Sequence, residues 1–245
     1  MTADHWGTID GTSIDFPIVV DEMRSATLTF SVPAAPAADL LPGDAFEVLE
    51  SAPGTAVLVV ALCDYVRNPW GDYVEVNLGL LAHPAGRPDE AGAFVWRMPV
   101  DQEFTCRAGN EVLGLPKTVE DLTVDYGGDV VTFRLRSDGA DTLTVALPRP
   151  AATAPPERTE TVTFSYLGGV PHAVPLGIDL PSGLVDPADV RIELGTGPVA
   201  DELRSLGLPR PADLVLWGEG LGGTFGRPVP LVEQGGGPDE PGAPA

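Results

Sequence analysis

Short apolar runs rich in β-branched and aromatic residues alternate with turn residues along most of the chain. Runs of this kind are typical of β-strands, and the Gly, Pro, Asn and Asp between them are typical of turns. In the first half, the pattern predicts strands over residues 27–32, 45–49, 56–66, 73–81 and 93–100. In the second half, it predicts strands over residues 122–126, 130–135, 142–147, 161–167, 173–180, 190–194 and 214–218. The chain is therefore expected to fold mainly as β-sheet.

Several connections between these runs are short enough to be hairpin turns. Residues 67–72 (RNPWGD) contain Asn-Pro and Gly-Asp pairs and separate two long runs, which are therefore expected to pair as a hairpin. Residues 127–129 (GGD) and 137–139 (SDG) separate the three runs between 122 and 147. Turns of this composition predict a three-stranded meander.

Helical patterns are few and short. Residues 198–206 (PVADELRSL) have proline in the first turn, acidic residues early, arginine late and Gly207 as the stop, which predicts a helix. Residues 36–41 (PAADLL) have the length of one helical turn. Residues 102–113 fit either a helix or irregular structure, and Pro116 limits any helix there.

The chain of 245 residues fits one large β domain or two smaller units. Residues 151–156 (AATAPP) are the only candidate linker, and similar strands are predicted on both sides. We therefore expect a surface loop within a single domain of residues 1–232. Residues 233–245 have no apolar anchor and are expected to be disordered. With no signal-peptide pattern and no apolar run of membrane-spanning length, we expect a cytoplasmic protein without a membrane partner.

Charge narrows the possible partners. Thirty-six acidic residues against fourteen basic ones give a formal net charge of −22. This charge would repel the phosphate backbone of a nucleic acid, which is therefore not an expected partner, and equally an anionic membrane. A freely diffusing small molecule is easier to accommodate. An anionic substrate would require a focused positive site.

Motifs for metals and cofactors are missing. No HxH or HExxH spacing relates the three histidines, and no phosphate- or dinucleotide-binding fingerprint occurs, so neither a metal nor a cofactor is expected. Cys63 and Cys106 have apolar neighbours and no CxxC spacing, which predicts two buried free thiols rather than a bridge. The glycine-rich segment 218–226 is interpreted as a turn or a close approach of backbone near the site.

Lys117 is the only lysine, and the other thirteen basic residues are arginines. Arginine stays protonated at physiological pH, whereas a desolvated lysine can lose its proton and attack a carbonyl carbon. Residues 112–119 (VLGLPKTV) are largely apolar and are expected to hold the Lys117 amine away from water, where burial lowers a lysine pKa. The alternative is a surface lysine that survived by drift.

Residues 109–117 (GNEVLGLPK) resemble the acetoacetate decarboxylase family signature G-R-E-x-x-G-Y/F-P-K, which ends in the catalytic lysine. Residues 71–75 (GDYVE) resemble the family strand that carries an active-site acid, and residues 100–103 and 195–198 match its ordering. The resemblance covers most of residues 20–230. It implies strongly curved antiparallel sheets in a barrel- or cone-like fold, a homo-oligomer, and a small keto acid as substrate.

The resemblance also implies roles for individual residues. Lys117 is expected to be the nucleophile that forms a Schiff base, and Glu75 the group that moves protons. Leu115, inside the signature, is expected to contact the substrate. The substrate-facing arginine of the family aligns near Met23 or Arg24, so Arg24 is a second expected contact; a plain surface charge is the alternative.

Two tyrosines lie close to the expected acid. Tyr73 precedes Glu75 by two residues, and Tyr65 ends the strand expected to pair with it. Packing in the core is the first interpretation of both tyrosines, and a phenol supplied to the substrate pocket is the alternative, under which both are candidate substrate contacts.

The sequence departs from the family pattern in three places. Thr118 stands where a second lysine follows the catalytic one, Asn110 replaces the signature arginine, and the second active-site glutamate aligns near the apolar pair 59–60. Decarboxylation of a β-keto acid is the first expected reaction. An aldolase–dehydratase, or a condensing or cyclising enzyme of specialised metabolism using Lys117, is the alternative. A ligand-binding relative without turnover is a third hypothesis.

Overall fold

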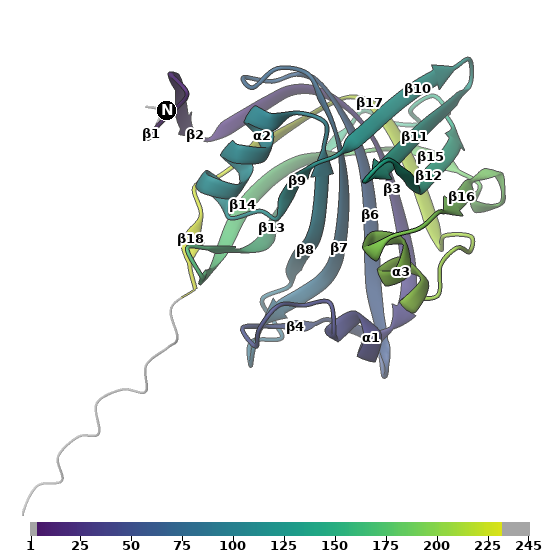
Figure 1. The fold of residues 1–245 in the computed structure, drawn as a ribbon, viewed down its shortest axis with the longest axis horizontal. Coiled ribbons are helices and arrows are strands. Elements are labelled where there is room, and N and C mark those ends of the chain that lie inside the picture. Colours follow the sequence, from purple (N-terminus) through teal and green to yellow (C-terminus); the bar gives the residue numbers. More distant parts are fainter. Residues whose placement is uncertain (1–3, 232–245) are drawn as a thin grey trace, which may run out of the picture.

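The computed structural model describes residues 4–231, and their backbone is mainly β-strand (Figure 1). Seven strands close into a barrel, and a few short helices lie at its ends and sides. The predicted mainly β, barrel-like fold is therefore confirmed. The tail predicted to be disordered, residues 233–245, lies outside the described residues. No helix within residues 4–231 has the length and apolar character needed to cross a membrane.

The barrel strands are β3 (Ile18–Pro33), β6 (Thr55–Arg67), β7 (Tyr73–Pro84), β8 (Gly92–Val100), β13 (Glu157–Leu167), β14 (Val170–Leu180) and β17 (Leu214–Phe225). Their order is β17-β3-β6-β7-β8-β13-β14, and pairing of β14 with β17 closes the barrel. Neighbours are antiparallel except β8 and β13, which are parallel. The predicted hairpin is confirmed, because β6 and β7 pair from Leu58–Leu80 to Tyr65–Tyr73.

A second sheet lies outside the barrel and contains β10 (Asp121–Gly127), β11 (Val130–Ser137), β12 (Ala140–Pro148) and β16 (Arg191–Leu194). Its first three strands are the predicted meander, which is confirmed. The main hydrophobic core joins apolar side chains of β3, β6 and β7 to those of this sheet; its fully buried members include Phe30, Leu58, Leu62, Phe133 and Leu135. The tightly packed core is thus outside the barrel, and the lumen is left for other side chains.

The helical elements are α1 (Ala34–Ala38), α2 (Glu103–Ala108), the π-turn η1 (Gly109–Leu113), the 3₁₀ turn η2 (Pro187–Asp189) and α3 (Pro198–Ser205). The helix predicted over 198–206 is confirmed as α3. The predicted turn of helix at 36–41 begins earlier, at Ala34. The ambiguous segment 102–113 is helical, as α2 followed by η1.

Seven short strands complete the structure: β1 (Asp4–Ile9), β2 (Thr12–Phe16), β4 (Phe46–Val48), β5 (Glu50–Ala52), β9 (Lys117–Val119), β15 (Gly183–Val185) and β18 (Val229–Pro230). The segment 218–226, predicted as a turn or a close backbone approach, is mostly part of strand β17. The close approach is present, because a Cβ at Gly218 would lie 2.8 Å from the Cβ of Pro181. The turn was the wrong part of that prediction.

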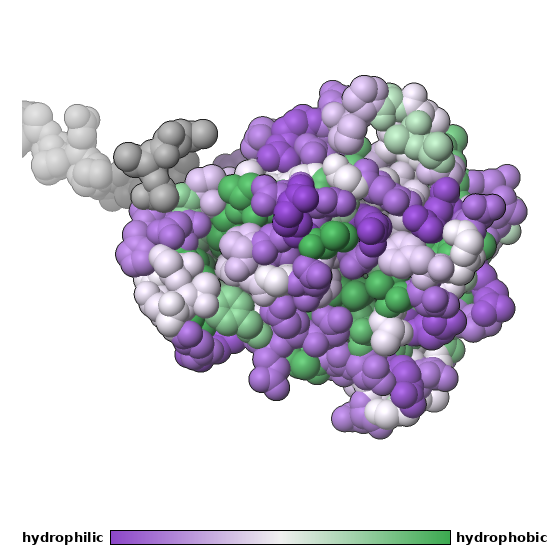
Figure 2. All heavy atoms as spheres, turned by 90° about the horizontal axis from the view of Figure 1, so that it is seen from above, coloured by the Kyte–Doolittle hydropathy of each residue, from purple (hydrophilic) through white to green (hydrophobic). Residues whose placement is uncertain are grey.

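Polar residues cover most of the face shown in Figure 2, and apolar residues there form small separate patches. The loop 151–156 connects β12 to β13, and strands on both sides of it share sheets, because β12 pairs with β16 and β13 pairs with β8. The chain before this segment and the chain after it therefore each contribute strands to both sheets.

Candidate active site

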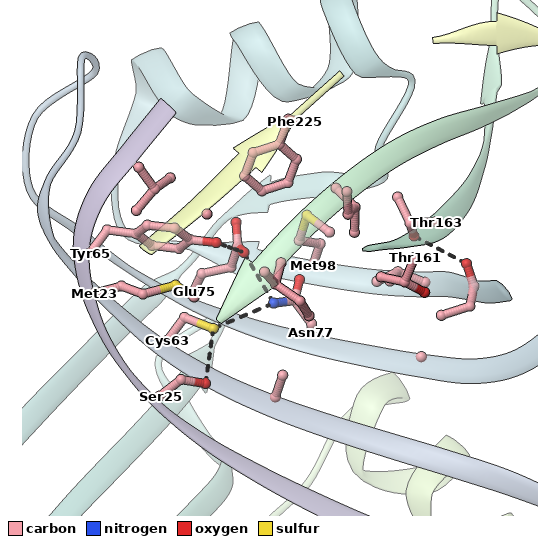
Figure 3. A pocket seen from close by; sticks show the side chains of 18 of the residues that line it. Met23, Ser25, Cys63, Tyr65, Glu75, Asn77, Met98, Thr161, Thr163 and Phe225 are labelled. Atoms are coloured by element: carbon pink, nitrogen blue, oxygen red, sulfur yellow. Dashed lines mark hydrogen bonds between the residues drawn. The ribbon is translucent and has the colours of Figure 1, made fainter. Parts of the chain in front are cut away.

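The barrel encloses a cavity of about 420 Å³ (Figure 3). All seven barrel strands contribute inward-facing side chains, because successive residues of a strand point to opposite faces. On β6, Val59 and Cys63 line the lumen, whereas Leu58 and Leu62 face the outer core. The lining is largely apolar, and its charged side chains gather at few points: Glu75, Lys117 and Asp179.

Helix α2 and turn η1 form the support for Lys117. The Gln102 side chain caps α2 by accepting a hydrogen bond from Thr105 N, and its amide nitrogen donates to the Trp70 carbonyl oxygen at 2.9 Å. The wide turn η1 ends at Gly114, whose φ of 68° is the left-handed conformation that glycine adopts without strain. The chain then turns back along β8, where Lys117 pairs with Met98.

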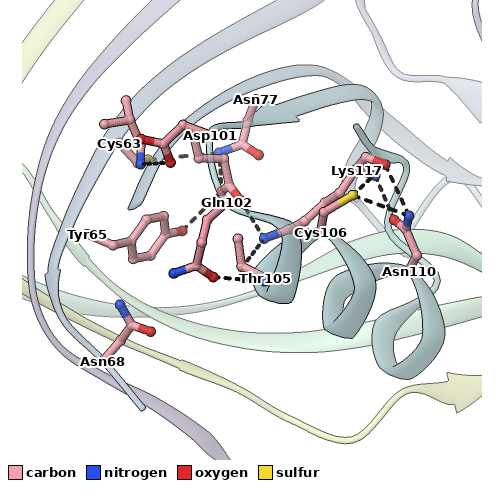
Figure 4. A network of polar contacts seen from close by, with 12 residues as sticks. Cys63, Tyr65, Asn68, Asn77, Asp101, Gln102, Thr105, Cys106, Asn110 and Lys117 are labelled. Carbon is pink, nitrogen blue, oxygen red and sulfur yellow. Dashed lines mark hydrogen bonds and ion pairs between the residues drawn. The ribbon is translucent and has the colours of Figure 1, made fainter. Parts of the chain in front are cut away.

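Asn110 fixes the backbone of Lys117 from within η1. Its side-chain oxygen accepts from Lys117 N at 2.8 Å, and its side-chain nitrogen donates to the Lys117 carbonyl oxygen at 3.1 Å (Figure 4). The hairpin formed by β1 and β2 packs on the same support, since Ile9 and Ile14 belong to one hydrophobic cluster with Val112. The backbone that carries Lys117 is therefore held on several sides.

Lys117 and Glu75 meet at one end of the cavity. The Lys117 Nζ lies 2.6 Å from Oε2 of Glu75, and each side chain is 4% exposed. The Thr105 hydroxyl lies 3.1 Å from Nζ, and the Tyr73 ring centroid lies 5.0 Å from it. Two opposite charges can be buried together at a low cost in free energy when they pair with each other and each has further hydrogen-bond partners.

The second oxygen of Glu75 is held by two donors. Tyr65 donates its phenol hydrogen to Oε1 at 3.1 Å, and the Asn77 amide donates to the same atom at 3.0 Å. The Tyr65 and Tyr73 rings stack with centroids 4.2 Å apart. Burial, reinforced by the negative charge of Glu75, raises the pKa of both phenols well above the ordinary value. Both tyrosines therefore remain protonated donors.

Gly109 provides the space in which the lysine side chain lies. A Cβ at this position would lie 2.6 Å from Cδ and 2.8 Å from Cε of Lys117. The Gly109 backbone is α-helical, with φ of −59°, so alanine suits its conformation. An alanine at position 109 would therefore suit the helical backbone but would occupy the space in which the Lys117 side chain lies.

Substituting Gly109→Ala is therefore expected to lower the melting temperature, because the gain of about 1 kcal/mol in helix preference is smaller than the cost of separating the buried Lys117–Glu75 pair. It should also displace Nζ from Glu75 and slow Schiff-base formation by about tenfold or more. Thermal denaturation and the rate of borohydride-dependent labelling measure the two effects. Gly127→Ala is the matched control, because its added Cβ would have no neighbour nearer than 4.0 Å. Labelling at the wild-type rate in Gly109→Ala would contradict the role of this close contact.

Arg24 does not line the cavity, so the predicted substrate contact is wrong for this residue. Its guanidinium lies outside the lumen, 2.9 Å from Asp64. The cause is a change of phase in β3: Ile18 and Val20 face inward, and after an irregularity in pairing Met23 faces inward instead. Strand irregularities of this kind re-aim the side chains that follow.

The thiols and histidines have no part in this pair. Cys63 lines the cavity, and burial, reinforced by Glu75, raises the pKa of its thiol to about 12, so it stays protonated at neutral pH. Both cysteines are free, as predicted, but Cys106 is only partly buried. Within residues 4–231 no group of three or more His, Cys, Asp or Glu side chains is placed to hold a metal ion.

Comparison with family sequence profiles connects this geometry to known proteins. The profile of the acetoacetate decarboxylase (ADC) family matches residues 11–229, a range that includes Glu75, Lys117 and the cavity between them. The chain belongs to the acetoacetate decarboxylase family. A sequence comparison with curated proteins finds no match.

Three solved structures share the fold of this acetoacetate decarboxylase family member. The acetoacetate decarboxylase of Legionella pneumophila has a TM-score of 0.66 at 14% identity, covering 89% of this chain and 88% of that one. An acetoacetate decarboxylase-like enzyme of Sphingomonas wittichii has a TM-score of 0.59 at 17% identity, covering 92% and 97%. The enduracididine biosynthesis enzyme MppR, in complex with pyruvate, has a TM-score of 0.54 at 15% identity, covering 88% and 91%. At these identities the likeness shows the fold alone.

Departures from the acetoacetate decarboxylase signature have visible consequences in the structure. Thr118 is exposed, so the position of the second lysine points away from the cavity. Val59 lines the lumen and Val60 lies in the outer core, so both positions aligned with a second glutamate are apolar. Asn110, in place of the signature arginine, instead holds the Lys117 backbone.

The structure brings the other sequence-predicted residues of this family member together. Leu115, Tyr65 and Tyr73 all line the cavity with the Lys117–Glu75 pair. Sequence reasoning missed Thr105 and Asn77, although periodicity offered a signal for both. Asn77 follows Glu75 by two residues on one strand and so shares its face, and Thr105 precedes Gly109 by four residues in a helical segment.

Proposed function

We propose that this protein is a lyase that binds a ketone substrate as a Schiff base on Lys117, with Glu75 as the proton-transfer group. The observation that carries the proposal is the 2.6 Å contact between Nζ and Oε2 of Glu75, buried at one end of an otherwise apolar cavity. A nucleophilic amine needs a base within hydrogen-bond reach and a site without water. Both conditions are met by these two side chains.

The first stage is formation of the iminium ion. Glu75 accepts a proton from the Lys117 ammonium, and the neutral amine adds to the carbonyl carbon of the ketone. One proton of the added amine then moves to the former carbonyl oxygen, which becomes a hydroxyl group. The protonated Glu75 then donates to the new hydroxyl group, which leaves as water while the nitrogen lone pair forms the C=N bond. The Tyr65 and Asn77 hydrogen bonds to Oε1 keep the carboxyl group oriented through these transfers.

The second stage uses the iminium ion as an electron sink. If the bond broken at the neighbouring carbon leads to a carboxylate, its electron pair forms the enamine and CO₂ leaves. If it is a C–H bond, Glu75 accepts the proton, and the enamine then attacks an aldehyde or expels a β-hydroxyl group as water. Protonation of the enamine carbon restores an iminium ion, and hydrolysis of that ion, or of the conjugated iminium ion, releases the carbonyl product and returns free Lys117.

One observation favours the second route, aldol condensation and dehydration. Removal of a proton requires a base beside the iminium nitrogen, and Glu75 occupies that place. Loss of CO₂ requires no base, and the negative charge of Glu75 would repel a substrate carboxylate beside it. Decarboxylation of a β-keto acid, the first reaction expected from the sequence, remains the competing outcome of the test.

Trapping experiments on the wild-type protein test this function. Incubation with ketones, keto acids and borohydride should add one reduced ligand per chain, on the peptide that contains Lys117. With the productive substrate, consumption of an aldehyde with loss of water indicates the condensation and dehydration route, whereas release of CO₂ indicates decarboxylation. If no ligand in a broad panel gives an adduct on Lys117, the enzymatic proposal fails and a ligand-binding role replaces it.

A further inference from the structure

We infer that the substrate of this cavity is an uncharged, elongated and largely apolar ketone rather than a small keto acid. The inference rests on the proposed Schiff-base chemistry at Lys117 and adds the class of molecule that the chemistry acts on. Four features of the cavity lead to it: the pairing of its charged groups, the direction of nearby arginines, its length, and its uncharged polar groups.

Every charged side chain along the described cavity wall already has a partner. Lys117 is 2.6 Å from Glu75, and Asp179 is 3.1 Å from Arg158 and accepts a hydrogen bond from Gly222 N at 2.7 Å. A substrate carboxylate entering this space would find no cation that is free of a protein carboxylate. It would bring one uncompensated negative charge into an apolar site, which strongly opposes binding.

Two arginines that are adjacent in sequence to residues of the cavity wall direct their charge away from the cavity. Arg24 points out of the barrel to Asp64, and the methionine beside it, Met23, takes the inward place. Arg158 is 41% exposed and is not part of the cavity wall. The net charge of −22 adds a repulsive field around the whole molecule. The wall therefore lacks the focused positive site that an anionic substrate needs.

The cavity is long as well as uncharged. At one end Lys117 pairs with Met98 of β8, and farther along the same strand Ala93 pairs with Thr163. Met98 and Thr163 line the cavity (Figure 3). Ala93 is also part of the cavity wall. Five residues of extended strand span about 17 Å. The volume of about 420 Å³ falls in the range of roughly 300–1,000 Å³ that holds drug-sized ligands, larger than a molecule such as pyruvate fills.

Apart from Asp179, which is paired with Arg158, the polar side chains of the cavity wall away from the lysine are neutral. Thr159, Thr161 and Thr163 alternate along β13 and place a row of hydroxyl groups on the cavity wall. The side-chain oxygen of Asn77 is buried and accepts no hydrogen bond from the described residues. Thr159 and Thr161 can donate to a ligand oxygen, and Asn77 can accept from a ligand hydroxyl group, whereas the Thr163 hydroxyl already donates to the Ala93 carbonyl oxygen at 3.1 Å.

A comparison of matched ligands on the wild-type protein tests the inference. The probes are a nine-carbon methyl ketone, the keto acid of equal length with a terminal carboxylate, acetone and pyruvate, each titrated with borohydride present. Half-maximal labelling of Lys117 should occur with the long neutral ketone at a concentration at least about tenfold below any other probe, because each buried methylene strengthens binding about fourfold. Equal or better labelling by a keto acid overturns the inference and leaves the Schiff-base function standing. Absence of labelling by every probe overturns both.

A charge placed inside the barrel provides a second test. Met23→Arg puts a guanidinium on the inward face of β3, and it should shift the labelling preference toward the long keto acid by about tenfold. Val19→Arg is the matched control: it adds the same charge to the same strand at a position that is 44% exposed and outside the cavity wall. An equal shift in both variants would show an effect of overall charge and would count against the inference. The wild-type titration decides the matter should Met23→Arg fail to fold.

Discussion

Replacing Lys117 with arginine is expected to abolish ligand-dependent labelling by borohydride and to lower turnover by at least about 10³-fold. Arginine retains the positive charge beside Glu75 and a side chain of similar length. Its guanidinium stays protonated, however, and so does not add to a carbonyl carbon. Intact-protein mass after trapping, followed by peptide mapping, measures the effect directly.

The composition of the chain makes this experiment clean. Lys117 is the only lysine, so in the wild-type chain the terminal amine is the one other primary amine that borohydride labelling can reach. Arg24→Lys is a matched control, because it adds a lysine outside the lumen while leaving the cavity wall intact. Its ligand adduct should still map to Lys117 and not to position 24. Ligand-dependent labelling or turnover that persists in Lys117→Arg would refute the nucleophile assignment.

Replacing Glu75 with glutamine is expected to slow proton exchange at the carbon next to the ketone by about 10² to 10⁴-fold. Glutamine has nearly the same shape, and its side-chain oxygen can still accept from Tyr65 and Asn77. It cannot take up the proton that the amine or the substrate carbon must lose. The measurement is the rate of deuterium incorporation into a bound ketone, followed by NMR.

The control for this second substitution is Glu193→Gln, which removes one negative charge at a surface position of β16 that is 58% exposed. Exchange there should remain within about twofold of wild type, because exposed ion pairs contribute little. An exchange rate in Glu75→Gln within about threefold of wild type would show that another group moves the proton. Slow but detectable labelling of Lys117 in the same variant would separate proton transfer from nucleophilic attack.

Much of the fold was accessible from local patterns. Runs rich in β-branched residues located all seven barrel strands, at least in part, and the composition of residues 67–72 predicted the hairpin of β6 and β7 correctly. The hairpin of β1 and β2 was missed, because its short strands lack a clear apolar alternation. The second half of β17, residues 219–225, was missed as well. A glycine-rich segment is typical of turns, and its composition does not indicate which strands it pairs with.

The sequence predicted those residues of the candidate site that lie in segments resembling family motifs. Lys117 and Glu75 were located by resemblance, and the structure places them in contact. Arg24 was misassigned because the face of β3 on which its side chain lies depends on the irregularity in strand pairing, and no local sequence pattern predicts that irregularity. The absence of an unpaired cation along the described cavity wall likewise depends on which face each strand turns inward, a property of the closed barrel rather than of any segment.

The irregularity in β3 has a consequence for how such barrels diversify. If the break in alternation lay four residues farther along the strand, Glu22 and Arg24 would enter the lumen in place of Met23 and Ser25, with no codon changed. The polarity of the cavity therefore depends on the register of the β3 backbone as well as on which side chains the strand carries. Relatives aligned column by column can share a residue and yet present it to opposite sides of the wall. A library that moves this break along β3 would change several inward-facing side chains at once, whereas a point substitution changes one. Such a library would therefore sample more classes of ligand.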